Sequence, residues 1–141
     1  MKILLAEDTA DLNKVICAVL NHEGYDVDPA FDGEEAMERI NTEGYDCLIL
    51  DIMMPKKDGI GILKAIAGME KKPITLATSC FMTEYVSTAA ANLGVRYLML
   101  KPCDMTALVE RLQEIRGGEN QRKTAALCSR QRNILPATFL W

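Results

Sequence analysis

Carboxylate side chains stand at the ends of two short apolar runs in this sequence. Glu7 and Asp8 come directly after residues 3–6 (ILLA), and Asp51 comes directly after residues 47–50 (CLIL). Carboxylates that lie close together repel one another unless a cation is present or their pKa values rise. Magnesium prefers oxygen ligands and takes one or two carboxylates together with phosphate oxygens. The three acids therefore predict a Mg²⁺ site, in which a carboxylate can serve as the nucleophile that forms an aspartyl-phosphate.

A hydroxyl pair and a lysine follow two later apolar runs. Thr78 and Ser79 end the run that starts at position 74, and Lys101 follows the run 95–100. In open parallel α/β sheets, functional groups gather just past the carboxyl ends of the strands. We therefore expect these side chains to lie beside the three acids. There, a positive charge and a hydroxyl would stabilise a phosphoryl group during its transfer.

The elements that must position these residues follow from the hydropathy pattern. Apolar runs predict strands at 3–6, 25–28, 46–51, 74–78 and 95–100. Helical spacing predicts helices with apolar residues between 12 and 20, 36 and 40, 60 and 69, 85 and 93, and 105 and 115. The first of these stripes consists of Leu12, Val15, Ile16, Val19 and Leu20. Strands alternating with helices predict an α/β fold, a parallel sheet with helices on both faces.

Length and composition favour one globular domain. The chain has 141 residues and a formal net charge of −4, which argues against a nucleic-acid binder. Its five cysteines include no C-x-x-C pair, so neither a disulfide framework nor a zinc site is expected. No apolar run approaches the ~20 residues that cross a bilayer, and no signal-peptide core is present. We therefore expect a cytoplasmic protein that does not contact a membrane.

The end of the chain differs from the rest. Residues 117–141 carry four basic residues and one acidic residue, and they begin with Gly117-Gly118. This change predicts a domain over residues 1–116 and a basic tail or linker over residues 117–141. The tail could lead into an effector domain, act as a docking segment, or be a non-native extension.

Taken together, these motifs resemble the receiver domain of two-component response regulators. The resemblance covers residues 2 to about 116. It is carried by Glu7-Asp8, the segment 51–59 (DIMMPKKDG), a hydroxyl after the fourth strand, and Lys101-Pro102. It implies a flavodoxin-like (βα)5 fold with strand order 2-1-3-4-5. It also implies a signalling module, not an enzyme with a diffusible substrate, that catalyses its own phosphoryl transfer. The bulky apolar side chains of Met53 and Phe81, two positions after Asp51 and Ser79, predict that its own dephosphorylation is slow.

The resemblance assigns a role to each matching residue. Asp51 would accept the phosphoryl group, and Lys101 would pair with its oxygens. Asp8 and Asp51 would bind Mg²⁺ directly, Glu7 would bind it through water, and the carbonyl of Met53 would complete the protein ligands. The Lys101-Pro102 peptide is expected to be cis, as in relatives. By contrast, Asp58-Gly59 reads as a turn and a helix entry, a structural role.

The resemblance also implies partners. The phosphoryl donor would be a sensor histidine kinase or a phosphotransfer protein. A homodimer through the face formed by the fourth helix, fifth strand and fifth helix is one possible assembly. DNA would be a partner only if an effector domain follows the chain.

The hydroxyl that would switch on phosphorylation is Ser79 or Thr78. Spacing favours Ser79, because the family hydroxyl lies fifteen positions before the glycine that ends the fourth helix, here Gly94. The chain also departs from the family pattern in the fifth strand. Leu98 stands where relatives usually carry an aromatic residue, and Tyr97 lies one place earlier.

Two other functions use related chemistry. An aspartate-nucleophile, Mg²⁺-dependent phosphatase of the haloacid-dehalogenase kind needs a second Asp two residues after the nucleophile, and this chain has Met53 there. A flavin-binding module on the same fold needs small residues and N–H donors after the first strand, where Glu7 and Asp8 would repel a phosphate. The receiver is therefore the preferred interpretation, with the phosphatase as its alternative.

Overall fold

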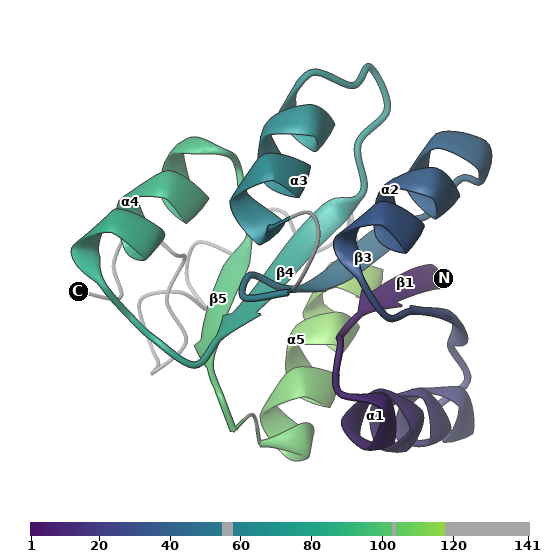
Figure 1. Ribbon diagram of the computed structural model, residues 1–141. Coiled ribbons are helices and arrows are strands. Elements are labelled where there is room, and N and C mark those ends of the chain that lie inside the picture. Colours follow the sequence, from purple (N-terminus) through teal and green to yellow (C-terminus); the bar gives the residue numbers. More distant parts are fainter. Residues whose placement is uncertain (55–57, 103, 118–141) are drawn as a thin grey trace.

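The computed structural model describes residues 1–54, 58–102 and 104–117. In these residues strands and helices alternate along the chain. They are β1 (Lys2–Ala6), α1 (Ala10–His22), β2 (Asp26–Ala30), α2 (Gly33–Thr42), β3 (Cys47–Asp51), α3 (Gly59–Ala67), β4 (Ile74–Ser79), α4 (Glu84–Asn92), β5 (Tyr97–Leu100) and α5 (Met105–Gly117). All neighbouring strands are parallel and the sheet order is β2-β1-β3-β4-β5, so the predicted flavodoxin-like topology is confirmed (Figure 1).

Helices cover both faces of the sheet. α1 and α5 pack on one face, and α2, α3 and α4 pack on the other (Figure 1). Successive strand residues point to opposite faces. In β1, for example, Ile3 and Leu5 face α1 and α5, whereas Leu4 and Ala6 join the other core. β3 lies in the middle of the sheet and all its residues are buried, as its uninterrupted apolar run predicts.

Short polar side chains begin three of the helices. Asp32 accepts a hydrogen bond from the Glu35 N–H at α2, Asp58 from the Gly61 N–H at α3, and Thr83 from the Val86 N–H at α4. Such caps each contribute about 1 kcal/mol, because they satisfy N–H groups that have no partner within the helix. The predicted structural role of Asp58 is therefore confirmed.

Gly59 is required by a close backbone approach. Its N–H donates to the Ile52 carbonyl at 2.9 Å. A Cβ at this position would lie 2.4 Å from the Ile52 Cα, a distance that no side chain can tolerate. Gly59 thus brings the start of α3 against the chain that leaves β3, just beyond Asp51.

The observed bounds differ from the predicted ones at several strand ends. Tyr25 does not belong to β2, because its N–H donates to the Leu20 carbonyl and ends α1. Val95 precedes β5 for the same kind of reason, since its N–H donates to Ala90 at the end of α4. β4 continues through Ser79. The Lys101-Pro102 peptide is cis, as expected.

The predicted stripe of α1 is partly wrong. Leu12 and Val15 are 36% and 53% exposed, whereas Asn13, Ile16 and Leu20 are buried. Residues three and seven positions apart share one helix face. The face of α1 that packs on the sheet is therefore rotated about the helix axis relative to the predicted one, and Asn13 occupies a buried position where an apolar residue was expected. A polar side chain is therefore enclosed next to the end of β1.

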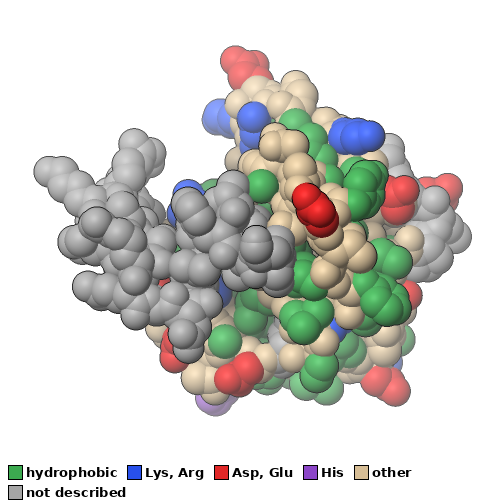
Figure 2. Space-filling view, turned by 90° about the vertical axis from the view of Figure 1, so that its left-hand side faces the viewer, with side chains coloured by type: hydrophobic (Ala, Val, Ile, Leu, Met, Phe, Trp, Pro, Cys, Tyr) green, Lys and Arg blue, Asp and Glu red, His purple; other side chains and the backbone are tan. Residues whose placement is uncertain are grey.

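Several large apolar side chains remain on the surface. They are Leu12, Val15, Phe31, Met53, Phe81, Tyr85 and Leu100. Hydrophobic side chains are visible on the face that carries α4 (Figure 2). Among the described residues, no helix has both the length and the apolar character needed to cross a membrane. α5 runs to Gly117, and the tail 118–141 lies outside the described residues.

Candidate functional site

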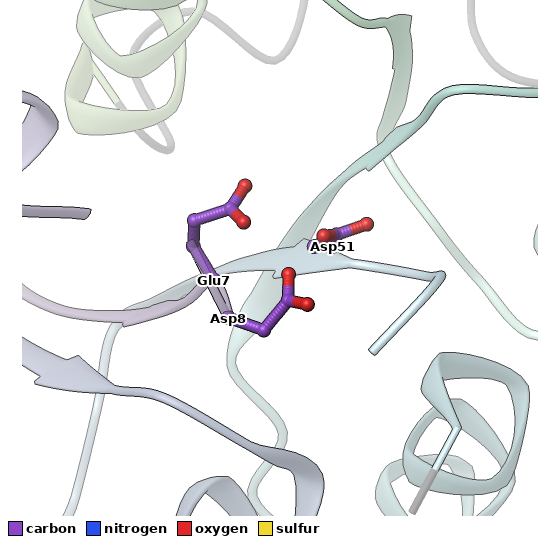
Figure 3. A group of neighbouring side chains, drawn as sticks. All are labelled: Glu7, Asp8 and Asp51. Atoms are coloured by element: carbon purple, nitrogen blue, oxygen red, sulfur yellow. The ribbon is translucent and has the colours of Figure 1, made fainter. Parts of the chain in front are cut away.

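The three predicted acids meet at the carboxyl ends of β1 and β3. These strands are neighbours in the sheet, so the residues that follow them are brought side by side. Carboxylate oxygens of Glu7, Asp8 and Asp51 lie within 4.8 Å of one another (Figure 3). Glu7 and Asp51 are buried, and Asp8 is exposed. The group therefore opens to solvent on the side of Asp8.

Lys101 balances the two buried carboxylates. Its Nζ lies 2.5 Å from Glu7 Oε1 and 3.0 Å from Asp51 Oδ2. Burial disfavours the ammonium form, but the hydrogen bonds to Glu7 and Asp51 outweigh this cost and raise the pKa of Lys101 above its ordinary value. Burial also raises the pKa of Glu7, an effect that the Lys101 hydrogen bond partly offsets. The predicted placement of Lys101 beside the acids is confirmed.

Backbone N–H groups hold the carboxylates in place. Asp51 Oδ1 accepts a hydrogen bond from the Met53 N–H at 3.0 Å. Glu7 Oε2 accepts one from the Thr9 N–H at 3.0 Å. Both carboxylates are therefore held by a cation on one oxygen and by a peptide N–H on the other. The Met53 side chain itself is 51% exposed.

The donor set suits a hard divalent cation. It consists of three carboxylates, without a thiolate or an imidazole in the cluster. Oxygen-only sites of this kind favour magnesium or calcium over zinc. Lys101 already neutralises part of the negative charge, which limits the repulsion between the acids in the absence of a metal.

The two candidate hydroxyls point to opposite faces of the sheet. Ser79 is fully buried, and its Oγ donates to the Phe81 carbonyl at 2.7 Å and accepts from the Phe81 N–H at 3.2 Å. Thr78 pairs with Asp51 in the β3–β4 register. It lines a small cavity of about 90 Å³ together with Glu7 and Lys101. The choice between Ser79 and Thr78 as the switch residue stays a prediction.

The aromatic residue of β5 is Tyr97, which lies on the opposite face of the sheet from position 98, where the family pattern has its aromatic residue. Leu98 packs in the core beneath α2, α3 and α4, whereas Tyr97 packs on the α5 side. The Tyr97 hydroxyl donates to Glu114 Oε2 at 2.5 Å, and Arg111 lies 3.6 Å from the other oxygen of Glu114. An aromatic ring held against α5 cannot rotate toward α4.

Sequence reasoning missed Asn13. This fully buried residue donates through Nδ2 to the Glu7 carbonyl at 3.0 Å and to the Ala30 carbonyl at 3.2 Å. Asn13 lies three residues before Ile16 and seven before Leu20, so it shares their helix face. This spacing could have predicted that Asn13 is buried, but the apolar residues Leu12 and Val15 suggested a different buried face.

The sequence of this chain is similar to those of known proteins. The family model of the response regulator receiver domain matches residues 3–113. The transcriptional regulatory protein DltR of Streptococcus agalactiae serotype III (strain NEM316) is 37% identical over 115 residues, which are 80% of this chain and 50% of that protein. The response regulator ArlR of Staphylococcus saprophyticus is 34% identical over 112 residues, 79% of this chain and 50% of that protein.

Solved structures show the same fold. The receiver domain of the Francisella response regulator 1452 superposes with a TM-score of 0.76 at 29% identity, covering 81% of this chain and 94% of that one. The BeF3-activated N-terminal receiver domain of Klebsiella pneumoniae RstA gives 0.73 at 26% identity, covering 80% and 96%. The chain spans about half the length of the curated relatives it matches.

Proposed function

The chain belongs to the response regulator receiver domain family, and from this premise we propose that Asp51 accepts a phosphoryl group from phosphohistidine. The donor would be a sensor histidine kinase or a phosphotransfer protein. The observation that carries the proposal is the placement of Asp51. It is a buried carboxylate at the end of the central strand, held by Lys101 and the Met53 N–H beside two further acids.

The residues of the chain account for the transfer. A carboxylate oxygen of Asp51 forms the bond to phosphorus while the phosphorus–nitrogen bond of phosphohistidine breaks, and its electron pair stays on the imidazole. Lys101, now bound to Asp51 Oδ2, can move its hydrogen bond to a phosphoryl oxygen. The Met53 N–H can turn from Asp51 Oδ1 to the same group. Charge-assisted donors of this kind stabilise a phosphoryl group most strongly where water is excluded.

Receiver domains generally bind Mg²⁺ at an acidic pocket, and the pocket of this chain has the donors for it. Asp8 and Asp51 would bind the ion directly, Glu7 through water, and Met53 through its carbonyl. When bound, Mg²⁺ supplies positive charge that offsets the carboxylates and the phosphoryl oxygens. The exposed position of Asp8 leaves a route for the ion to enter.

The output would pass to a partner or to a further domain. The curated relatives are named as a transcriptional regulatory protein and a response regulator, and this chain matches about half of each. We propose that the face formed by α4, β5 and α5 mediates dimerisation, where Tyr85 and Leu100 are 69% and 53% exposed. DNA would be contacted only through an effector domain.

The phosphatase alternative has less support. Its general acid would lie two residues after Asp51, where the half-exposed thioether of Met53 cannot donate a proton. Turnover of a small phosphate monoester by the purified protein would reverse this preference.

Mass spectrometry after treatment with acetyl phosphate and Mg²⁺ tests the proposal. The wild type should gain one phosphoryl group, on the peptide that contains Asp51, and Asp51→Asn should gain none. Asp58→Asn is a matched control, since Asn also caps a helix and Asp58 lies outside the pocket. Equal labelling of Asp51→Asn and wild type would refute the proposed role of Asp51.

A further inference from the structure

We propose that Asn13 is a positioning residue for the acidic pocket, one that orients the peptide unit joining Glu7 to Asp8. This inference rests on the proposed function, because it concerns the affinity of that pocket for Mg²⁺. Asn13 lies in the first turns of α1 and does not itself belong to the cluster of acids.

The side-chain amide of Asn13 uses all its polar atoms. Its two N–H groups point at two backbone carbonyls, those of Glu7 and Ala30. Its Oδ1 accepts the thiol hydrogen of Cys17 one turn later, at 3.3 Å. A fully buried amide with each group satisfied is fixed in orientation, because any rotation would leave a buried polar atom without a partner.

The two acceptors lie at the ends of two neighbouring strands, Glu7 just after β1 and Ala30 at the end of β2. The Ala30 carbonyl ends β2 and also accepts the Glu7 N–H at 3.0 Å. Asn13 therefore ties the N-terminal part of α1, the segment after β1 and the end of β2 together. An apolar residue on this helix face would pack as well, but it would leave the Glu7 carbonyl buried without this donor.

The Glu7 carbonyl is the point through which Asn13 acts on the pocket. This oxygen lies in the planar peptide unit that also contains the Asp8 nitrogen, so fixing it fixes the direction in which the chain enters Asp8. Asp8 is exposed, unlike the buried Glu7 and Asp51, and therefore has less surrounding structure to hold it. Groups that hydrogen-bond directly to metal ligands typically change metal affinity by ~10–100-fold when removed, and for Asn13, which acts through the backbone, we expect the lower end of this range.

Isothermal titration of Mg²⁺ into the full chain tests the inference. Asn13→Leu keeps the branched shape of the side chain and removes both donors, and we expect its dissociation constant to rise about 10-fold. Asn13→Ser should also weaken binding, since its short hydroxyl cannot reach both carbonyls, and it is the variant to use if Asn13→Leu does not fold. Wild-type affinity in a folded Asn13 variant would overturn the inference.

Two controls separate positioning from general stability. Cys17→Ala removes the contact at Oδ1 but keeps both donors to the carbonyls, and Ile16→Val weakens the packing of the same helix without removing a hydrogen bond. Both should bind Mg²⁺ within about 2-fold of wild type, and Ile16→Val should still lower the melting temperature. If Ile16→Val weakens Mg²⁺ as much as Asn13→Leu does, the effect is one of stability and the inference is wrong. If wild type binds no Mg²⁺, or binds it as well after Asp8→Asn, the proposed function itself fails.

Discussion

At the scale of single residues, Lys101 determines the charge balance of the pocket. It contacts two carboxylates that are almost fully enclosed, and its own side chain is only 14% exposed. Removing one partner of a buried ion pair leaves uncompensated charge, which costs far more than the net contribution of the pair. The same ammonium that would pair with the phosphoryl oxygens thus also stabilises the pocket before phosphorylation.

Lys101→Met should lower the free energy of unfolding by about 3 kcal/mol at neutral pH, because Glu7 and Asp51 then lose their shared counter-charge. Millimolar Mg²⁺ should restore part of this loss by supplying another cation. Urea unfolding with and without Mg²⁺ measures both effects. Lys64→Met, at an exposed site on α3, should change little. Equal stability of the two variants would contradict this account of Lys101.

Met53 and Phe81 should make the phosphorylated state long-lived. Hydrolysis needs a water in line with the bond, and these residues lie two positions after Asp51 and Ser79. Both side chains are exposed and apolar, at 51% and 62%, so they cannot hold such a water by hydrogen bonds. Met53→Asn and Phe81→Glu should accelerate loss of the phosphoryl group by about an order of magnitude, measured as decay in excess Mg²⁺. Unchanged decay would mean that a partner phosphatase sets the lifetime.

At the scale of elements, β4 and β5 are the strands whose connections a phosphoryl group would alter. Ser79 ends β4 with its hydroxyl bound to the Phe81 backbone, at the start of the segment that leads into α4. On β5, Leu98 faces the α4 side and Tyr97 is bound to α5. Any shift transmitted to α4 would therefore proceed through Ser79 without a rotating aromatic ring.

Beryllofluoride should shift the conformational population of residues 79–100. To reach a phosphoryl mimic on Asp51, Ser79 must exchange its hydrogen bonds with Phe81 for new ones, which biases a two-state element. NMR relaxation dispersion with and without beryllofluoride measures the change. Ser79→Ala should abolish it and Thr78→Val should preserve it. The opposite result would identify Thr78 as the switch hydroxyl, and no change in wild type would exclude this switch.

Tyr97 should contribute to alkaline unfolding. Burial, followed by the hydrogen bond to Glu114, raises its pKa from 10.0 to about 12, although Arg96 and Arg111 oppose the shift. The folded chain then retains a proton that the unfolded chain loses, so stability is full below pH 10 and falls as the pH rises toward 12. Between pH 10 and pH 12 the free energy of unfolding should therefore fall more in the wild type than in Tyr97→Phe, by up to about 2 kcal/mol. Urea unfolding at several pH values measures the difference, and parallel curves would contradict it.

At the scale of the whole molecule, the pocket connects parts that are distant in sequence. Glu7, Asp51 and Lys101 come from β1, β3 and the end of β5, and they meet only when the sheet has formed. A ligand that needs all these strands in place binds the folded state alone. Its binding energy is therefore added to the stability of the domain.

Mg²⁺ should raise the melting temperature of the chain. A ligand present at 100 times its dissociation constant stabilises the folded state by about 2.7 kcal/mol. Calorimetry at matched ionic strength, with Na⁺ in place of Mg²⁺ as the control, measures the shift. Asp8→Asn should remove most of it, because Asp8 would be a direct ligand. A shift of equal size in Na⁺, or in Asp8→Asn, would mean that the ion does not bind in this pocket.

Sequence alone determined the sheet and most of the pocket. Apolar runs alternating with helical stripes predict parallel strands, and parallel strands end at the same edge, so acids and a lysine at their ends had to converge. This reasoning placed Glu7, Asp8, Asp51 and Lys101 together without knowledge of any contact, and the structure confirms it.

Only the tertiary structure decided how each element is rotated and which atoms meet. The hydropathy pattern of α1 is compatible with several rotations of the helix about its axis. In the folded protein, packing on the sheet buries Asn13 and leaves Val15 exposed. The direction of Tyr97 depends on where β5 begins its pairing, since a shift of one residue reverses the face. The hydrogen bonds from Asn13 to Glu7 and from Tyr97 to Glu114 depend on these rotations and registers. A sequence pattern gives the spacing of residues within one element, but it does not give the orientation of that element relative to its neighbours.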